Sequence, residues 1–223
     1  MSNKNRRLIL WMFFVAVFAQ VQAQPGTAFW NDIVAFRKAD SLHAPAAGQI
    51  LFVGSSSFTM WKDVQSYFPS HPIINRGFGG SSLPDLIRYA EDVIFKYAPR
   101  QIVIYCGEND LGASDTVSAA TVAERFKTLF SMIRQRFPRV PIVFVSLKPS
   151  PSRQHLLPKM LEANTAIRQF LKKKKKTTFI DVYHPMLSDD GKPRPDIFLD
   201  DKLHMNAQGY AIWQKLIEPH LLK

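Results

Sequence analysis

Cysteine is almost absent from this sequence, which has Cys106 alone among its 223 residues. One cysteine cannot form an internal disulfide, so the fold must be stabilised by packing. Cys106 closes the apolar run Ile102–Tyr105, which favours a small buried core residue over the alternative of a cysteine nucleophile. With 46% hydrophobic and 12% aromatic residues, the chain can fill one sizeable core, and a single domain is expected.

Long apolar runs are also scarce, and the only one is Leu8–Phe18. It follows three basic residues and precedes the small-residue pattern Val21-Gln22-Ala23. This order is typical of a secretory signal peptide, and the segment is too short to span a bilayer comfortably. We therefore predict a signal peptide at residues 1–23, one domain at residues 24–223, and export to the periplasm or the medium. The alternative is an uncleaved membrane anchor; after cleavage no stable membrane span is expected.

Acidic residues are outnumbered, with 18 Asp and Glu against 29 Lys and Arg. Residues 1–23 hold three of the basic residues and no acidic ones, so the remainder has 26 against 18 and a net charge of +8. Much of this excess lies in five consecutive lysines, Lys172–Lys176. Nucleic-acid patches usually interleave aromatic or arginine residues with such a run. We expect a solvated helix end and no nucleic-acid partner, with attraction to anionic surfaces or polymers as the alternative. The oligomeric state cannot be read from the sequence.

No internal repeat or interdomain linker interrupts the chain, and short apolar runs alternate with amphipathic segments. The runs, expected as strands, are Ile50–Val53, Pro72–Ile74, Gln101–Cys106, Ile142–Ser146 and Thr178–Val182. The segments expected as helices are Ala28–Leu42, Asp85–Tyr97, Thr121–Phe137, Leu156–Leu171 and Ala207–Leu222. Alternation of this kind predicts an α/β fold, with a five-stranded parallel sheet covered on both faces.

The first apolar run ends at Gly54 and is followed at once by Ser55, Ser56 and Ser57. Active sites of open α/β sheets lie beyond the carboxyl ends of buried parallel strands. Each of these hydroxyls is therefore a candidate nucleophile.

A glycine-rich segment, Asn75–Ser82, follows the second predicted strand. A dinucleotide site would need a third glycine where Ser82 stands, and an acidic residue about 20 positions on, where the chain has Arg100. A loop whose backbone amides face a developing oxyanion fits these residues better.

Three further polar residues are candidates for the site: Asn109, and the pair Asp201 and His204. Asn109 can donate its side-chain amide to an oxyanion, although for this residue taken alone a turn or helix cap is the favoured explanation. Asp201 and His204 are spaced so that the carboxylate can orient the imidazole as a general base. Helix capping by Asp201 is the alternative for this pair. Metal binding is disfavoured, because no second histidine or cysteine lies nearby at ligand spacing.

Taken in order, these residues resemble the conserved blocks of the SGNH/GDSL hydrolase family. Ile50–Phe58 resembles the first block, Asn75–Ser81 the second, Gly107–Asp110 the third and Asp201–His204 the last. The resemblance extends from about Ile50 to Trp213. It implies a three-layer, flavodoxin-like α/β/α sandwich.

The resemblance also implies residue roles. Ser56 would be the nucleophile, His204 the general base and Asp201 its orienting partner. The oxyanion hole would consist of the backbone N–H groups of Ser56 and Gly80 and the side-chain amide of Asn109. No metal or other cofactor is implied. One position departs from the family pattern, because Ser55 stands where the family has an aspartate.

The expected activity is ester hydrolysis through an acyl-enzyme, without a cofactor. Export and the lack of a long hydrophobic lid favour short acyl groups, such as O-acetyl on carbohydrate or small molecules. Lipase-type, thioesterase-type and acyltransferase activities stay open, as does a noncatalytic glycan-binding module on the same fold. Arg153, in a proline-rich loop, is a candidate for substrate binding, against the simpler alternative of a structural arginine.

Overall fold

The computed structural model describes residues 26–223, and the predicted signal peptide at residues 1–23 lies outside this range. Within residues 26–223, no helix has both the length and the apolar character needed to cross a membrane.

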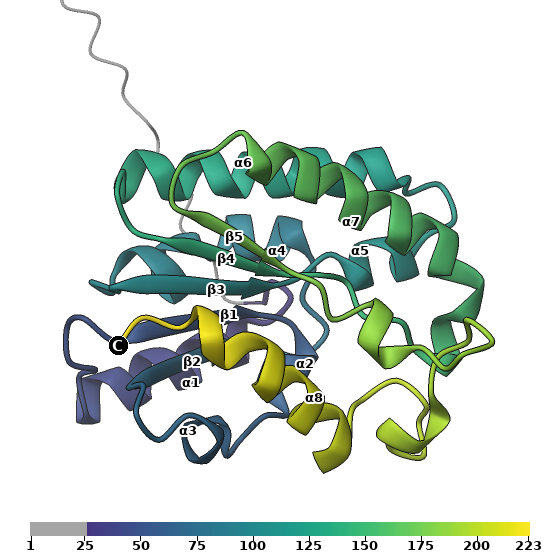
Figure 1. Cartoon of the computed structure of the whole chain (residues 1–223). Coiled ribbons are helices and arrows are strands. Elements are labelled where there is room, and N and C mark those ends of the chain that lie inside the picture. The colour runs from purple at the N-terminus through teal and green to yellow at the C-terminus, as the bar shows by residue number, and fades with distance from the viewer. Residues whose placement is uncertain (1–25) are drawn as a thin grey trace, which may run out of the picture.

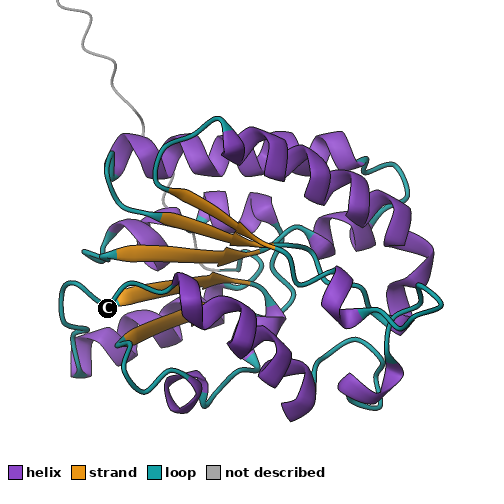
Figure 2. Cartoon of the chain, viewed as in Figure 1, coloured by secondary structure: helices purple, strands orange, loops and turns teal. Residues whose placement is uncertain are grey.

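A single five-stranded parallel sheet lies at the centre of the fold, with the strand order β2-β1-β3-β4-β5. Its strands are β1 (Ile50–Gly54), β2 (Ile73–Gly77), β3 (Gln101–Tyr105), β4 (Ile142–Val145) and β5 (Thr177–Ile180). All of the predicted apolar runs overlap these strands, because buried parallel strands are apolar on both faces. Figure 2 shows the arrows directed toward one edge, so the segments that follow the strands share that edge.

Helices cover both faces of the sheet, which confirms the predicted three-layer α/β/α sandwich (Figure 1). Alternate strand residues contribute to two separate cores: Leu51 and Val53 face one, and Ile50 and Phe52 face the other. The first core is covered by α1 (Trp30–Leu42), α4 (Leu83–Arg88), α6 (Ala119–Arg136) and α7 (Leu157–Lys172). The second is covered by α2 (Ser56–Thr59), α3 (Val64–Tyr67) and α8 (Ala207–Ile217).

Two of the predicted helices are interrupted. The segment expected as one helix at Asp85–Tyr97 ends as α4 at Arg88 and continues as a π-helix, η1 (Glu91–Phe95). Val93, Ile94 and Phe95 are consecutive and all buried, which a regular α-helical stripe does not achieve. The last helix ends at Ile217 and is followed by the 3₁₀ turn η5 (Glu218–His220), which contains Pro219.

Short helices that the apolar pattern does not predict lie after the strands. Besides α2 and α3 they are α5 (Glu108–Ala113) and the 3₁₀ turns η2 (Pro151–Leu156), η3 (His184–Met186) and η4 (Pro195–Ile197). Their sequences are rich in polar residues and proline, so no apolar periodicity marks them. They carry most of the polar side chains at the carboxyl edge of the sheet.

Helix α8 is fixed to the central strands at both ends. The Tyr210 hydroxyl donates to the Ser57 carbonyl at 2.9 Å, and the Trp213 ring lies 4.8 Å from that of Tyr105. Beyond the helix, the Gln101 side chain donates to the His220 carbonyl at 2.8 Å and accepts from the Leu222 N–H at 2.9 Å. The segment after α8 is therefore held against β3 by hydrogen bonds.

Gly54, at the end of β1, is expected to be intolerant of any side chain. Its φ is +151°, and a Cβ added there would lie 1.9 Å from the Tyr105 carbonyl oxygen. We expect Gly54→Ala to lower the free energy of unfolding by about 2–3 kcal/mol or more, because β1 and β3 must separate to accept the methyl group. Urea unfolding would measure this.

Gly79 provides the matched control, because an added Cβ there has no atom within 4 Å. Gly79→Ala should change the unfolding free energy by less than about 0.5 kcal/mol. Equal stabilities of the two variants would contradict the close approach of β1 and β3 at Gly54.

Candidate active site

Ser56 is the first residue of α2, directly beyond the carboxyl end of β1. Phe58, two residues on, is buried and packs 4.9 Å from the Phe52 ring. The Asn75 side chain donates to the Phe58 carbonyl at 2.7 Å. These contacts fix the short helix, so the half-buried Ser56 hydroxyl has a defined position at the sheet edge.

His204 lies between Ser56 and Asp201. Its Nε2 is 3.0 Å from the Ser56 Oγ, and its Nδ1 is 2.5 Å from the Asp201 Oδ2. The other oxygen of Asp201 accepts from the backbone N–H groups of Leu203 and His204, each at 2.9 Å. The structure therefore brings together the three residues predicted as nucleophile, base and orienting partner, although Ser56 is 145 residues from Asp201 and 148 from His204 along the chain.

The carboxylate of Asp201 stays ionised in this arrangement. Partial burial raises the pKa of Asp201. Hydrogen bonds from the His204 side chain and from the His204 and Leu203 backbone more than offset this and lower the pKa to about 2. A carboxylate that accepts at Nδ1–H leaves the Nε2 lone pair directed at the serine hydroxyl. Ser56, His204 and Asp201 thus form a connected path for moving one proton.

Two backbone amides are available at the predicted oxyanion positions. Gly80 lies in an exposed turn after β2 with a φ of +84°. Within residues 26–223, neither the Ser56 N–H nor the Gly80 N–H has a hydrogen-bond acceptor. An unpaired N–H at a helix start or in a glycine turn can donate to a bound anion.

Asn109, the third predicted donor, is the second residue of α5. Its side-chain nitrogen donates to the Ser55 Oγ at 2.6 Å and to the Ser81 carbonyl at 3.0 Å. Both of its N–H groups are therefore engaged, and an oxyanion would have to take the place of one of these acceptors. Ser55, at the position where the family has an aspartate, thus contacts the oxyanion-hole candidate rather than His204.

Arg153, the candidate for substrate binding, has its identified partners within the protein. Its guanidinium lies 3.0 Å from the Glu108 Oε1 and donates to the Asn109 Oδ1 at 2.8 Å. Its side chain is 19% exposed. These contacts favour the structural alternative, and a direct contact with substrate stays a prediction.

Sequence reasoning missed two charged residues behind Asn109. Lys148 and Glu108 are both buried, with the Lys148 Nζ 2.9 Å from the Glu108 Oε2. The signal was present, because Lys148 directly follows the apolar run that ends at Leu147, and Glu108 directly follows Gly107. A charged residue at the end of a buried strand is unusual unless it is paired.

Cys106 has the buried position predicted for it. It is fully covered, and its thiol donates weakly to the Ser81 carbonyl at 3.7 Å. Burial raises the pKa of the thiol well above its ordinary value. A cysteine held in the thiol form is a poor nucleophile, so the environment favours the serine.

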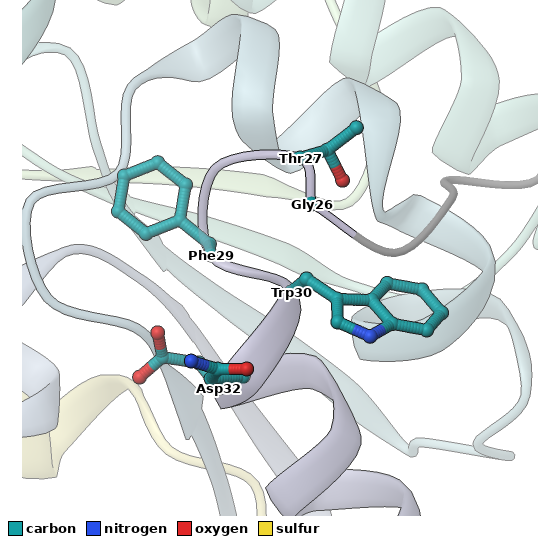
Figure 3. A pocket seen from close by; sticks show the side chains of 6 residues that line it. Gly26, Thr27, Phe29, Trp30 and Asp32 are labelled. Atoms are coloured by element: carbon teal, nitrogen blue, oxygen red, sulfur yellow. The ribbon is translucent and has the colours of Figure 1, made fainter.

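The N-terminal loop borders the glycine turn. Gly26, Thr27, Phe29, Trp30 and Asp32 line a hollow on the surface, and Figure 3 shows the Phe29 and Trp30 rings on opposite sides of the backbone. The Phe29 ring lies 5.4 Å from that of Phe78 and 3.7 Å from the position that a Gly80 Cβ would take. Phe29 thus packs beside the predicted oxyanion loop.

Metal-binding groups are not assembled at this site. Across residues 26–223, no three His, Cys, Asp or Glu side chains are grouped so that they could hold a metal ion.

Solved structures with the same fold include several acylhydrolases. A Bacteroides fragilis protein described as a candidate acylhydrolase has 22% identity and a TM-score of 0.72, over 86% of this chain and 96% of its own. A GDSL-like lipase from Bacteroides thetaiotaomicron has 22% identity and a TM-score of 0.71, over 84% and 96%. A Streptococcus pneumonia protein, named as a candidate platelet activating factor, has 19% identity and a TM-score of 0.75, over 86% and 92%. At these identities the likeness establishes the fold.

Sequence comparison establishes the family. No curated protein sequence matches the chain. The profile of the GDSL-like lipase/acylhydrolase family, however, matches residues 40–212, which include every residue of the predicted catalytic set. The chain therefore belongs to the GDSL-like lipase/acylhydrolase family, and it is an ester hydrolase.

Proposed function

We propose that the chain removes short acyl groups, such as O-acetyl, from carbohydrate or small-molecule esters through an acyl-enzyme on Ser56. The observation that carries this proposal is the continuous hydrogen-bonded series from Ser56 Oγ to His204 Nε2 at 3.0 Å and from His204 Nδ1 to Asp201 Oδ2 at 2.5 Å.

In the first half of the reaction, His204 Nε2 takes the Ser56 proton while Oγ attacks the acyl carbonyl carbon. Asp201 accepts from Nδ1–H and stabilises the imidazolium. The tetrahedral intermediate then collapses, the bond to the leaving oxygen breaks, and the Nε2 proton passes to the departing alcohol.

In the second half, water enters and gives a proton to His204 as its oxygen attacks the acyl-serine. Collapse of the second intermediate returns the proton to Ser56 Oγ and releases the carboxylic acid. The N–H groups of Ser56 and Gly80, with the Asn109 amide, would stabilise the oxyanion in both halves. Each such donor contributes about 3 kcal/mol of barrier reduction in comparable enzymes.

The preference for a short acyl group is supported by the polarity of the site. Polar groups surround the reacting serine: the His204 imidazole contacts Ser56, the Asn109 amide contacts the adjacent Ser55, and the Arg153 guanidinium contacts Asn109. A fatty acyl chain needs an extended apolar surface to gain binding energy, whereas an acetyl group does not. An acetylxylan esterase from Geobacillus stearothermophilus also has this fold, at 14% identity and a TM-score of 0.61.

Three measurements test the proposal. A fluorophosphonate probe should label one serine, and mass-spectrometric mapping should place it at Ser56. The kcat/KM values for p-nitrophenyl esters should be highest for acetate and fall as the acyl chain lengthens. Acetylated xylooligosaccharides should release acetate.

Each contrary outcome identifies an alternative. An optimum at eight or more carbons would favour a lipase-type or thioesterase-type enzyme. Transfer of the acyl group to a sugar in preference to water would indicate an acyltransferase. The absence of labelling would instead favour the noncatalytic glycan-binding module.

We also propose that the chain is exported, with cleavage after Ala23. The support is the basic start and apolar run of residues 4–18. N-terminal sequencing of protein recovered outside the cytoplasm should begin at Gln24. Recovery of the uncut chain in the membrane fraction would support the anchor instead.

A further inference from the structure

A buried network of charges lies directly behind the Asn109 side chain. Glu108 accepts from the Tyr105 hydroxyl and is paired with two cations, Lys148 at 2.9 Å and Arg153 at 3.0 Å. The side chains of Lys148 and Glu108 are 1% and 6% exposed. Removing charged groups from water costs free energy. Close pairing must offset this cost, or the charges must be retained because they have a function.

One hydrogen bond joins the network to the Asn109 side chain. Arg153 donates from one nitrogen to the Asn109 Oδ1 at 2.8 Å, while another nitrogen pairs with Glu108. Glu108 remains ionised: burial raises its pKa, but Lys148 and Arg153 more than offset this and lower it below the ordinary value. The guanidinium is thus anchored on one side by a fixed carboxylate.

This contact and the hydrogen bond to the Ser81 carbonyl together fix which way the Asn109 amide faces. With Oδ1 accepting from the guanidinium, the NH₂ group must point toward Ser55 and Ser81, as observed. A flipped amide would place NH₂ against the N–H donors of Arg153 and Oδ1 against the Ser81 carbonyl oxygen, so both of these hydrogen bonds would be lost. A cation at Oδ1 also polarises the amide and strengthens Nδ2–H as a donor.

The loop that carries Arg153 also contacts the turn that carries His204. The Ser152 N–H donates to the Lys202 carbonyl at 3.0 Å, within the segment between Asp201 and His204. The same six residues, 148–153, thus connect the oxyanion candidate with the proton-transfer residues.

We propose that Arg153 is a positioning residue that holds the Asn109 amide in the orientation needed for oxyanion stabilisation, with Glu108 and Lys148 as its buried anchor. This inference rests on the proposed function of Ser56 and Asn109 and extends it. It also accounts for a lysine and a glutamate buried beside an esterase site. Arg153 acts through Asn109 and need not touch the substrate.

The test compares Arg153→Met with Arg153→Lys and with the control Arg125→Met. Arg125 also pairs with a buried carboxylate of α5, Asp110, at 2.8 Å, but it does not contact Asn109. With p-nitrophenyl acetate, Arg153→Met should lower kcat by about 10- to 100-fold with KM changed less than about threefold, since one oxyanion donor is worth 10²–10³ in kcat. Arg153→Lys should recover part of this loss, and Arg125→Met should keep its kcat.

The decisive measurement is the double variant with Asn109→Ala. If Arg153 acts through Asn109, Arg153→Met should lower kcat by less than about twofold once Asn109 is alanine, because the two changes remove the same interaction. A full, multiplicative loss in the double variant would overturn the proposal. A rise in KM at constant kcat would also overturn it, because it would make Arg153 a substrate contact.

A second variant covers the case in which Arg153→Met fails to fold. A Cβ at Gly112 would lie 3.3 Å from the Arg153 Cζ and 3.4 Å from its Nη2, the atom that donates to Asn109, so Gly112→Ala should displace the guanidinium by a few tenths of an ångström. We expect a several-fold loss of kcat that again disappears in the Asn109→Ala background; an unchanged kcat would count against the proposal. Failure of the proposed function would appear separately, as absence of probe labelling at Ser56 in the unmodified protein.

Discussion

Replacing Ser56 by alanine is expected to lower kcat for p-nitrophenyl acetate by about a million-fold, the loss seen when the nucleophile of a comparable serine hydrolase is removed. The Ser56 Oγ is the group in contact with His204 Nε2, and alanine leaves the base without a proton to transfer. The fold should persist, because Ser56 is half-buried and its hydroxyl anchors no backbone group within residues 26–223. Initial-rate kinetics and circular dichroism on the purified variant would measure both effects.

The adjacent serine provides the matched control. Ser57 is buried and holds α8 through its backbone carbonyl, not its hydroxyl. Ser57→Ala should therefore keep kcat within about threefold, as expected for a side chain outside the reacting groups. If Ser56→Ala retained activity while Ser57→Ala lost it, the nucleophile would be misassigned.

Replacing His204 by alanine should cost nearly as much as replacing Ser56, about 10⁵- to 10⁶-fold in kcat, because the nucleophile and base act as a unit. The double variant should be no slower than either single variant. Asp201→Asn should cost about 10⁴-fold, since the amide favours the wrong imidazole tautomer. The pKa of Asp201, about 2, keeps its carboxylate ionised over the range in which ester hydrolysis is assayed.

A second Asp-x-x-His pair in the chain provides a stringent control. The His184 Nδ1 lies 2.7 Å from the Asp181 Oδ2, so the two pairs have the same internal geometry. His184 is 61% exposed, and no serine hydroxyl within residues 26–223 contacts its ring. His184→Ala should keep kcat within about twofold, as for other exposed positions. If His184→Ala lost activity while His204→Ala kept it, the general base would be His184, and the assignment of His204 would be wrong.

These two pairs show what the sequence can and cannot predict about the site. Both match the same motif, and periodicity does not separate them. Both pairs also follow the third block and precede the last helix, so the residues that come next are needed to choose: Leu203–Asn206 followed by Gly209-Tyr210 resembles the end of the family pattern and identifies Asp201 and His204. That Ser56 meets His204 is a fact of chain topology, since β1 and the turn before α8 come together at one edge of the sheet.

Strands and long helices could be predicted because burial imposes a period on apolar residues. The same reasoning could not foresee η1, because Leu86, Ala90, Val93 and Tyr97 have the spacing of an ordinary amphipathic helix. It also could not foresee that Glu108, Lys148 and Arg153 converge, because pairing across 40 residues leaves no local pattern. The substitution at Ser55 is visible in the sequence, but its contact with Asn109 is not.

The attachment of α8 to the central strands also has a consequence for the order of events during synthesis. His204 and the helix whose Tyr210 hydroxyl fixes the Ser57 carbonyl are synthesised after all five strands. The nascent chain would therefore contain Ser56 and the oxyanion loop before it contains His204. It would not hydrolyse esters until α8 is synthesised and docks.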